Sequence, residues 1–373
     1  MKNIQRALVL VGTRPEAVKM APVVIELRRR AHLQCLLVAT GQHRRMLSQT
    51  LAAFDLQADE DLEVMREDQE LAGLTARLLE ALTGTYRRLS PDAVLVQGDT
   101  TTVLAGALAA FYERIPVGHV EAGLRTHDLD APWPEELNRT LADRICTWCF
   151  APTETARENL LREGVPQERI FVTGNTVIDA LLWMRDRIRR KPPELPDGLA
   201  ALVGRHRTLL VTAHRRESFG ETLERMCHAM LRIVEQFPDA AIVYPVHLNP
   251  NVRKPVKRLL SGRERIRLLE PLAYEAFVWL MDHCHFVLTD SGGVQEEAPS
   301  LGKPVLVMRE KTERPEGIAA GTACLVGTRV EKILAEVSRL MDDPTEYDRR
   351  SKVANPYGDG KAAHRIVELL TCR

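Results

Sequence analysis

Short apolar runs alternate with longer segments of helix-forming residues along the first half of the chain. The runs at 7–11, 36–40, 93–96 and 116–120 are almost continuously apolar, which is typical of parallel strands covered on both faces. Helical patterns follow, two of them ending near Leu27 and Ala110, and a long one covers residues 71–89. Strands that alternate with helices at this spacing predict an open, mostly parallel α/β sheet.

The second half repeats the pattern after a charged, proline-rich passage at 189–196, which has the composition of a surface or linker segment. The strand predicted at 208–212 corresponds to the one at 7–11, and the strand that begins at Phe286 corresponds to the one at 93–96. Each half therefore predicts a doubly wound domain. Ligands of such sheets bind beyond the carboxyl ends of the strands, so two facing domains would place both sets of turns across one cleft.

The turn after the strand at Phe286 is the strongest single candidate for a binding site. This strand ends at Asp290-Ser291-Gly292-Gly293 and passes directly into a helical segment. Adjacent glycines let the main chain approach a phosphate, the Ser291 hydroxyl adds a donor, and a helix N-terminus favours negative charge. Glu297, one helical turn further on, could accept hydrogen bonds from a ribose. The alternative is a tight connection that binds nothing.

Composition narrows the classes of function. The chain has 373 residues, enough for two domains, and its 51 basic residues balance 51 acidic ones. A net charge of zero provides no overall field that favours nucleic acid or an anionic membrane. No apolar run reaches the roughly 20 residues that span a bilayer, and the first residues lead into a strand pattern. We therefore expect a cytoplasmic protein without membrane or nucleic-acid partners.

The cysteines and nucleotide motifs add two exclusions. The seven cysteines are scattered, and the pair Cys146 and Cys149 lies in a mostly apolar stretch, which favours buried structural thiols over zinc or redox chemistry. The chain has no P-loop and no dinucleotide fingerprint after a strand. Neither ATP nor nicotinamide chemistry is predicted.

The turns that follow the strands carry charged and polar residues, and the two halves of the chain differ in which kinds they carry. Taken singly, each of these residues has a structural alternative as a surface ion pair or a helix cap. Taken together, they indicate carboxylates on one side and phosphate binders on the other. Carboxylates crowded in a closed cleft raise one another's pKa, so that one can act as a general acid near neutral pH. The residues are Arg14, Lys19, Asp99, Glu121 and Glu135 in the first half, and His214, Arg215, Ser291, Glu297 and Arg314 in the second.

Several of these residues belong to a set of eight strings that runs, in order, over nearly the whole chain. The strings are Gly12-Thr13-Arg14-Pro15-Glu16, Gly98-Asp99-Thr100-Thr101-Thr102, Val120-Glu121-Ala122-Gly123-Leu124-Arg125, Pro132-Trp133-Pro134-Glu135-Glu136 with Asn138-Arg139, Thr173-Gly174-Asn175-Thr176, His214-Arg215-Arg216-Glu217, Asp290-Ser291-Gly292-Gly293 and Thr312-Glu313-Arg314-Pro315. As a set they closely resemble the non-hydrolysing UDP-N-acetylglucosamine 2-epimerase family.

The resemblance implies an α/β fold of the glycosyltransferase-B type, in which two Rossmann-like doubly wound domains face each other across a cleft. The first domain would comprise residues 1–174, completed by the C-terminal helix at 357–373, and the second residues 175–356. The resemblance also implies a homodimer that uses no metal or redox cofactor. The product would supply the synthesis of surface polysaccharides.

The implied reaction is the reversible conversion of UDP-N-acetylglucosamine into UDP-N-acetylmannosamine. UDP is eliminated to give 2-acetamidoglucal and is then added back, with a proton delivered to the opposite face of carbon 2. The resemblance assigns the acid and base work to Asp99, Glu121 and Glu135, in an order that stays open. It assigns the charge on UDP to Arg14, His214, Arg314 and the turn Ser291-Gly292-Gly293, the ribose to Glu297, the uracil to Leu272 and Phe277, and a further substrate contact to Lys19.

The bacterial family is also known for activation by a second substrate molecule. Gln42, His43 and Glu136 match positions associated with that site, whereas Asp68 stands where some relatives have a basic residue. Three rival functions remain open from the sequence. A UDP-sugar-dependent glycosyltransferase would need an acceptor, a hydrolysing epimerase would release free N-acetylmannosamine, and a binding protein without turnover would have no use for the carboxylates.

Overall fold

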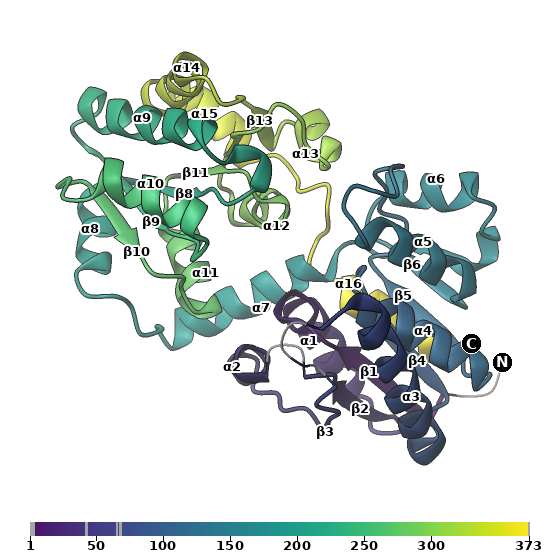
Figure 1. Ribbon diagram of the computed structural model, residues 1–373. Helices are drawn as coiled ribbons and strands as arrows, with labels where there is room; N and C mark the ends of the chain where they lie inside the picture. Colours follow the sequence, from purple (N-terminus) through teal and green to yellow (C-terminus); the bar gives the residue numbers. More distant parts are fainter. Residues whose placement is uncertain (1–3, 42–43, 65, 67–68, 372–373) are drawn as a thin grey trace. The chain divides into compact units, whose positions relative to one another are not determined.

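The chain divides into two compact units, one of Met1–Trp183 with Tyr357–Arg373 and one of Met184–Pro356. The computed structural model, drawn in Figure 1, describes residues 4–41, 44–64, 66 and 69–371. The division falls inside the helix α7 (Thr176–Arg190), close to the boundary expected at residue 174. In the described ranges, no helix is long and apolar enough to cross a membrane.

The first unit is built on a parallel sheet whose strand order is β3-β2-β1-β4-β5-β6-β7 among the described residues. β1 lies between β2 and β4, and this is where the strand order reverses. The strands are β1 (Arg6–Val11), β2 (Gln34–Ala39), β3 (Glu60–Asp61), β4 (Ala93–Gln97), β5 (Val117–Val120), β6 (Trp148–Ala151) and β7 (Ile170–Val172).

Helices cover both faces of this sheet, which explains why its central strands are apolar throughout. Leu8 and Leu10 of β1 pack with the apolar side of α3, including Leu78 and Tyr86. The last helix, α16, packs against α1 of the same unit. The helices are α1 (Arg14–Arg28), α2 (Arg44–Ala53), α3 (Leu71–Leu89), α4 (Thr101–Tyr112), α5 (Glu135–Ile145), α6 (Glu154–Arg162), the short η1 (Gln167–Arg169), the first part of α7, and α16 (Ala362–Thr371).

The second unit repeats the arrangement with the strand order β10-β9-β8-β11-β12-β13. Its strands are β8 (Arg207–Thr212), β9 (Ala240–Pro245), β10 (Ile266–Leu269), β11 (Phe286–Thr289), β12 (Val305–Val307) and β13 (Ala323–Leu325). Its helices are α8 (Leu199–Arg205), η2 (Arg216–Ser218), α9 (Glu221–Gln236), α10 (Pro250–Leu260), α11 (Tyr274–His283), α12 (Gly292–Glu297), η3 (Ala298–Leu301), α13 (Pro315–Ala320), α14 (Val330–Asp342) and α15 (Pro344–Ser351).

Neighbouring residues of a central strand point to opposite helical layers in this unit. Leu209 and Val211 of β8 join the core formed with α9, α10 and α14, whereas Leu210 joins the core formed with α8, α11 and α12. Both layers are apolar, so an alternating pattern of polar residues has no place in β8. The prediction of two Rossmann-like sheets is confirmed.

Corresponding turns lie at corresponding positions in the two sheets. The turn after β1 lies beside the turn after β4, and the turn after β8 lies beside the turn after β11, because each pair of strands is adjacent and parallel. In both sheets these are the points where the strand order reverses, which is where ligands of such folds bind.

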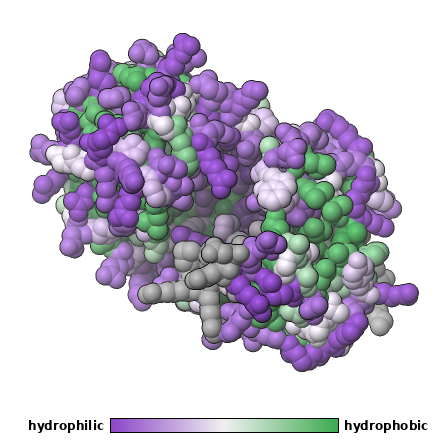
Figure 2. Space-filling model, viewed as in Figure 1, coloured by the Kyte–Doolittle hydropathy of each residue, from purple (hydrophilic) through white to green (hydrophobic). Residues whose placement is uncertain are grey.

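One surface of the first unit is unusually apolar. Phe111 and Tyr112, at the end of α4, expose 54% and 63% of their surface, and Leu137 and Leu141 on the neighbouring helix α5 expose 41% and 44%. Figure 2 shows hydrophobic surface over the part of the unit where α4 and α5 lie. Clusters of exposed large apolar side chains are a feature of contact surfaces.

Candidate active site

The turn between β1 and α1 is held together by one buried glutamate. Thr13 is the N-cap of α1, and its side chain accepts a hydrogen bond from the backbone of Glu16. The Glu16 side chain completes this capping box, because its Oε2 accepts hydrogen bonds from the backbone of Gly12 and Thr13 at 2.5 and 2.9 Å. Its Oε1 accepts a hydrogen bond of 2.5 Å from the hydroxyl of Thr100. Burial raises the pKa of Glu16 to about 7, although these three hydrogen bonds act to lower it. Arg14 begins α1 in this turn and is partly exposed.

Glu121 follows β5 and is held at both of its carboxylate oxygens. Lys19 Nζ donates to Oε1 and Oε2 at 2.6 and 2.7 Å, Gln97 Nε2 donates to Oε2 at 2.5 Å, and Asn175 Nδ2 donates to Oε1 at 3.0 Å. The residue is 8% exposed and has a φ of 69°, in the left-handed region that side chains other than glycine rarely adopt. A conformation of this kind costs on the order of 1–3 kcal/mol, which the four hydrogen bonds offset.

Asp99 lies at the end of β4, next to β5 in the sheet. Its carboxylate forms an ion pair with Arg139 of α5, and its carbonyl accepts a hydrogen bond of 2.9 Å from Asn138 Nδ2. About a third of its side chain is exposed, so the carboxylate is fixed but can still be reached by a ligand. Glu135 begins α5 and is partly exposed. The structure thus brings Asp99 and Glu121 to adjacent strand ends in one unit.

Glu136, one of the three residues connected with a second substrate site, is buried inside the first unit. It is 1% exposed, and its Oε1 accepts hydrogen bonds from the backbone of Thr126 and His127 at 3.0 and 2.9 Å. These hydrogen bonds hold the loop before α5, and Glu136 Oε2 lies 3.5 Å from Nη1 of Arg139, the ion-pair partner of Asp99. Gln42, His43 and Asp68 lie outside the described residues.

In the second unit, the buried carboxylate of Asp290 orders the turn after β8. Its Oδ2 accepts hydrogen bonds of 2.8 Å from the backbone of both His214 and Arg215, and its Oδ1 lies 3.4 Å from His214 Nδ1. The His214 ring stacks on His247, with ring centroids 5.5 Å apart. Burial, His247 and Arg215 lower the pKa of His214, against the opposing effect of Asp290. His214 is therefore a neutral imidazole at neutral pH.

The glycine turn after β11 has two guanidinium groups beside it. Ser291 is the N-cap of α12, and a Cβ atom built on Gly292 would lie 3.5 Å from Arg215 Nη2 and 3.8 Å from Arg314 Nη2. Arg314 forms an ion pair with the buried Glu296. The Nε of Arg215 is buried without a hydrogen-bond partner among the residues that the structure describes. Gly293 follows directly, so nitrogen donors gather around this turn, which suits an anion.

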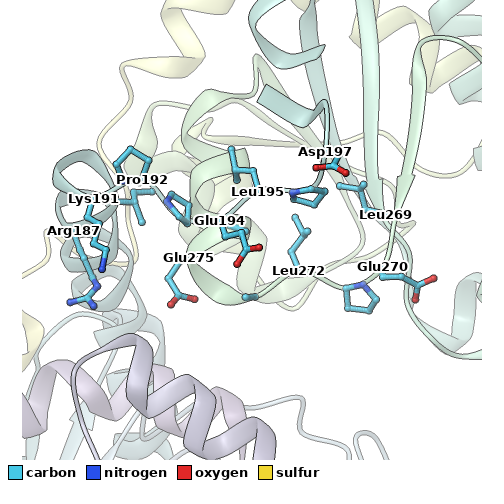
Figure 3. A pocket seen from close by; sticks show the side chains of 16 residues that line it. Arg187, Lys191, Pro192, Glu194, Leu195, Asp197, Leu269, Glu270, Leu272 and Glu275 are labelled. Atoms are coloured by element: carbon cyan, nitrogen blue, oxygen red, sulfur yellow. The ribbon is translucent and has the colours of Figure 1, made fainter. Parts of the chain in front are cut away.

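Of the residues expected around the nucleoside, Leu272 lies just before α11, Phe277 lies within it, and Glu297 ends α12. Glu297, at the end of α12, is 8% exposed, and Tyr274 OH donates to its Oε1 at 3.4 Å. Leu272 lines a cavity of about 850 Å³, which Figure 3 shows with Arg187 and Lys191 from the end of α7 at one side. Phe277 packs against the core formed with α8, α11 and α12 and is not among the residues that line this cavity.

Sequence reasoning assigned no role to several residues that the structure brings into the site. Gln97 and Asn175 hold Glu121, Arg139 holds Asp99, and Asp290 orders His214. A signal existed for all of them, because each lies within or directly beside one of the strings that carried the family resemblance. Their partners could not be read from the sequence, since Asn175 and Glu121 are 54 positions apart.

Among the described residues, no group of three or more histidine, cysteine, aspartate or glutamate side chains is arranged so that it could hold a metal ion. Cys146 and Cys149 are both buried, and burial raises the pKa of both thiols, which agrees with a structural role.

Known proteins resemble this chain over almost its full length. It is 54% identical over 368 residues to a UDP-N-acetylglucosamine 2-epimerase of Salmonella typhimurium, covering 98% of each chain. The solved structure of UDP-GlcNAc 2-epimerase from Neisseria meningitidis bound to UDP-GlcNAc is 45% identical, with a TM-score of 0.89 over 99% of this chain and 100% of that one. The Methanocaldococcus jannaschii enzyme in complex with UDP-GlcNAc and UDP is 34% identical, with a TM-score of 0.81 and the same coverage.

A family model described as UDP-N-acetylglucosamine 2-epimerase matches residues 25–371. This match runs from within α1 to the end of α16, so it leaves out β1 but includes Asp99, Glu121 and Glu135 of the first unit and the glycine turn of the second. Because this model and a relative that is 54% identical each cover nearly the whole chain, the chain belongs to the UDP-N-acetylglucosamine 2-epimerase family.

Proposed function

We propose that the protein interconverts UDP-N-acetylglucosamine and UDP-N-acetylmannosamine by eliminating UDP and adding it back. The observation that carries the proposal is the pair of fixed carboxylates, Asp99 and Glu121, at the ends of the adjacent strands β4 and β5. Removing a weakly acidic proton from carbon 2 needs a base held in place, and returning a proton to the other face needs an acid. A protein that only bound the nucleotide sugar would not need this pair.

The proposed reaction has two steps, the elimination of UDP and its re-addition. First a carboxylate removes the proton from carbon 2 while the bond between carbon 1 and the UDP oxygen breaks, which gives 2-acetamidoglucal and UDP. Then UDP attacks carbon 1 again, and a second acidic group protonates carbon 2 from the opposite face. Asp99, Glu121 and Glu135 are assigned to these two transfers. Lys19 holds Glu121 and is assigned a substrate contact.

The nucleotide is assigned to the donors gathered by the strand ends. Arg14, His214, Arg314 and the turn Ser291-Gly292-Gly293 would stabilise the charge that develops on the β-phosphate as UDP leaves. A neutral His214, oriented by Asp290, suits this role because it can take up a proton as negative charge appears beside it. Glu297 is assigned to the ribose, and Leu272 with Phe277 to the uracil. Two solved relatives contain bound UDP-GlcNAc, which supports the choice of substrate.

A second substrate molecule is proposed as an activator, with Gln42, His43 and Glu136 at its site. In this proposal Glu136 acts through the backbone of Thr126 and His127, which its carboxylate holds. The rate should then rise more steeply than hyperbolically with the concentration of UDP-N-acetylglucosamine. A strictly hyperbolic rate, together with a reverse reaction that proceeds without added UDP-N-acetylglucosamine, would remove this activator from the proposal.

The enzyme is further proposed to act as a homodimer through the exposed apolar side chains of α4 and α5, Phe111, Tyr112, Leu137 and Leu141. Light scattering of the purified protein should give twice the mass of 42.0 kDa, and Tyr112→Asp should shift it towards the monomer. A monomeric wild type would refute this part. The product would enter the synthesis of surface polysaccharides in the cytoplasm.

The test of the main proposal is proton NMR of the protein with UDP-N-acetylglucosamine in heavy water. UDP-N-acetylmannosamine with deuterium at carbon 2 is the expected product, because the acidic group that protonates carbon 2 carries a deuteron taken up from the solvent. Free N-acetylmannosamine would identify a hydrolysing enzyme. No reaction until an acceptor is added would identify a glycosyltransferase, and either of these results would overturn the proposal.

A further inference from the structure

His119, in the middle of the site's supporting structure, is a buried histidine that the proposed chemistry does not use. It lies on β5 two residues before Glu121 and is 0% exposed. Its Nδ1 is 2.6 Å from Asp143 Oδ1, and its Nε2 is 2.7 Å from the carbonyl oxygen of Gly98. Both ring nitrogens therefore face an acceptor.

These partners determine how many protons the ring carries. A carbonyl oxygen can only accept, so Nε2 must donate to Gly98. Asp143 is ionised, because its other oxygen forms an ion pair of 2.8 Å with the Arg125 guanidinium, which favours the charged carboxylate, and also accepts a hydrogen bond of 3.1 Å from the backbone of Gly123. Nδ1 must then donate as well. The ring is an imidazolium, with its charge balanced by a carboxylate that also binds Arg125.

The ionisation equilibria of the pair point the same way. Burial acts to lower the pKa of His119, but the Asp143 carboxylate and the Gly98 carbonyl raise it overall, against the effect of Arg125. Burial acts to raise the pKa of Asp143, but His119 and Arg125 lower it overall. Three segments face the ring with these groups: α5 with Asp143, the turn after β4 with Gly98, and the segment after β5 with Arg125. The thiols of Cys149 on β6 and of Cys146 are further titratable groups beside Asp143.

The network holds the two turns that carry Asp99 and Glu121. Gly98, which accepts from His119, has a φ of 83° and directly precedes Asp99. Gly123, which donates to Asp143, follows Glu121 by two residues, and Arg125 continues from Asp143 to Glu163. The buried pair of His119 and Asp143 thus holds the main chain next to Asp99 and next to Glu121.

We infer that His119 is a positioning residue for the epimerisation: as a permanent imidazolium paired with Asp143, it fixes the distance between the Asp99 turn and the Glu121 turn. The inference rests on the proposed function, in which these two carboxylates act on one carbon atom. An apolar residue of similar size would leave a buried carboxylate and a buried carbonyl without their donor, so the position is not a simple core position. A neutral side-chain amide could satisfy one of the two acceptors, but not both at this separation.

The charge of His119 can be measured without substrate. In the nitrogen-15 NMR spectrum of histidine-labelled protein at pH 7.5, we expect both ring nitrogens of His119 to carry protons, with the signal assigned by its absence in His119→Gln. His285 provides an internal reference, because burial, Arg207 and Lys303 lower its pKa to about 4 and keep it neutral at that pH. A neutral His119 would overturn the inference, whether or not the protein is an epimerase.

The positioning role predicts a specific kinetic change. His119→Gln should lower kcat by about 10- to 100-fold, because displacements of about 1 Å of a reacting group have effects of that size. KM for UDP-N-acetylglucosamine should change by less than about threefold, since the contacts assigned to the nucleotide are elsewhere. His228→Gln, a matched change at an exposed histidine on α9, should leave both constants unchanged. An unchanged kcat in His119→Gln, or a rise in KM alone, would contradict the inference.

Asp143→Asn provides a second variant of nearly the same volume if His119→Gln fails to fold. It should remove the imidazolium signal of His119 and lower kcat to a similar extent. A folded Asp143→Asn protein with full kcat would refute the positioning role. A wild type with the imidazolium signal but no turnover in heavy water would instead count against the proposed function, so the two failures can be told apart.

Discussion

In the first unit, the ionised groups beyond the strands are engaged by other protein groups, whereas in the second unit nitrogen donors converge on a glycine turn. Glu121 receives four hydrogen bonds from Lys19, Gln97 and Asn175, and Asp99 is paired with Arg139. In the second unit, Arg215 and Arg314 lie beside Gly292, and His214 is kept neutral.

The first sheet has one additional strand, β7, at its edge, and the order of the other six strands is the same in both sheets, so this difference comes from the turns and not from the fold. Proton transfer requires carboxylates that are held in place before the substrate binds. In the first unit, hydrogen bonds and ion pairs with other residues of the protein hold them. Binding a diphosphate requires donors gathered at one place, and the second unit gathers Arg215 and Arg314 beside Gly292, where they are also paired with Glu313 and Glu296. The comparison predicts that changes in the first unit affect turnover and that changes in the second affect binding.

The largest effect is expected at Glu121. Glu121→Gln should lower kcat by about 10²- to 10⁴-fold, the usual contribution of a positioned acid or base. UDP affinity, measured by calorimetry, should change little. Glu158→Gln, on the exposed side of α6, is the matched control and should have no effect on either quantity. Normal turnover with weakened UDP binding would reverse the assignment of the two units.

The next effect concerns Glu16 and the pH dependence of stability. Its pKa is raised from 4.5 to about 7 in the folded protein, so its contribution to stability is fully present below pH 4.5 and is lost as the pH rises to about 7. Between pH 5 and pH 8, urea denaturation should show the wild type losing about 2 to 3 kcal/mol relative to Glu16→Gln. Equal pH dependence in the two proteins would show that Glu16 ionises normally.

A smaller effect is expected at the glycine turn of the second unit. Arg314→Gln should raise the Kd for UDP by about 10-fold, because one charge-assisted hydrogen bond contributes about 1.5 kcal/mol. The variant Arg329→Gln removes an exposed guanidinium from the same unit and should bind UDP normally. If Arg314→Gln lowered kcat while UDP affinity stayed the same, the second unit would have a part in the proton chemistry.

The smallest effect is expected at the N-cap of α15, and it tests whether UDP binding in the second unit is independent of stability. Asp343 caps α15 by accepting hydrogen bonds from the backbone of Thr345 and Glu346 at 2.9 and 3.1 Å. Asp343→Ala should reduce stability by about 1 kcal/mol, as is usual for the loss of such a cap. Thermal denaturation should detect this change while calorimetry gives the wild-type Kd for UDP. A parallel loss of UDP affinity would mean that binding in this unit simply follows its stability.

Much of the fold was predictable because it depends on local patterns. The apolar strand runs, the polar turns that end them and the long helix at 71–89 were all evident in the sequence, and α3 has these bounds. The correspondence between the two halves was also predictable, and β4 and β11 do occupy equivalent places in the two sheets. The roles given to the site residues remain predictions, although the structure brings Asp99 and Glu121 together as expected.

The sequence by itself determined the two parallel sheets, the polar residues at their strand ends and the family, because apolar periodicity and short ordered motifs are properties of neighbouring positions. Only the tertiary structure decided which charges meet. Lys19 is 102 positions from Glu121, and Asp143 is 24 from His119, so neither pairing has a local signal. The charge of His119 and the raised pKa of Glu16 arise from burial and from partners on other elements, and both exist only once the chain is folded.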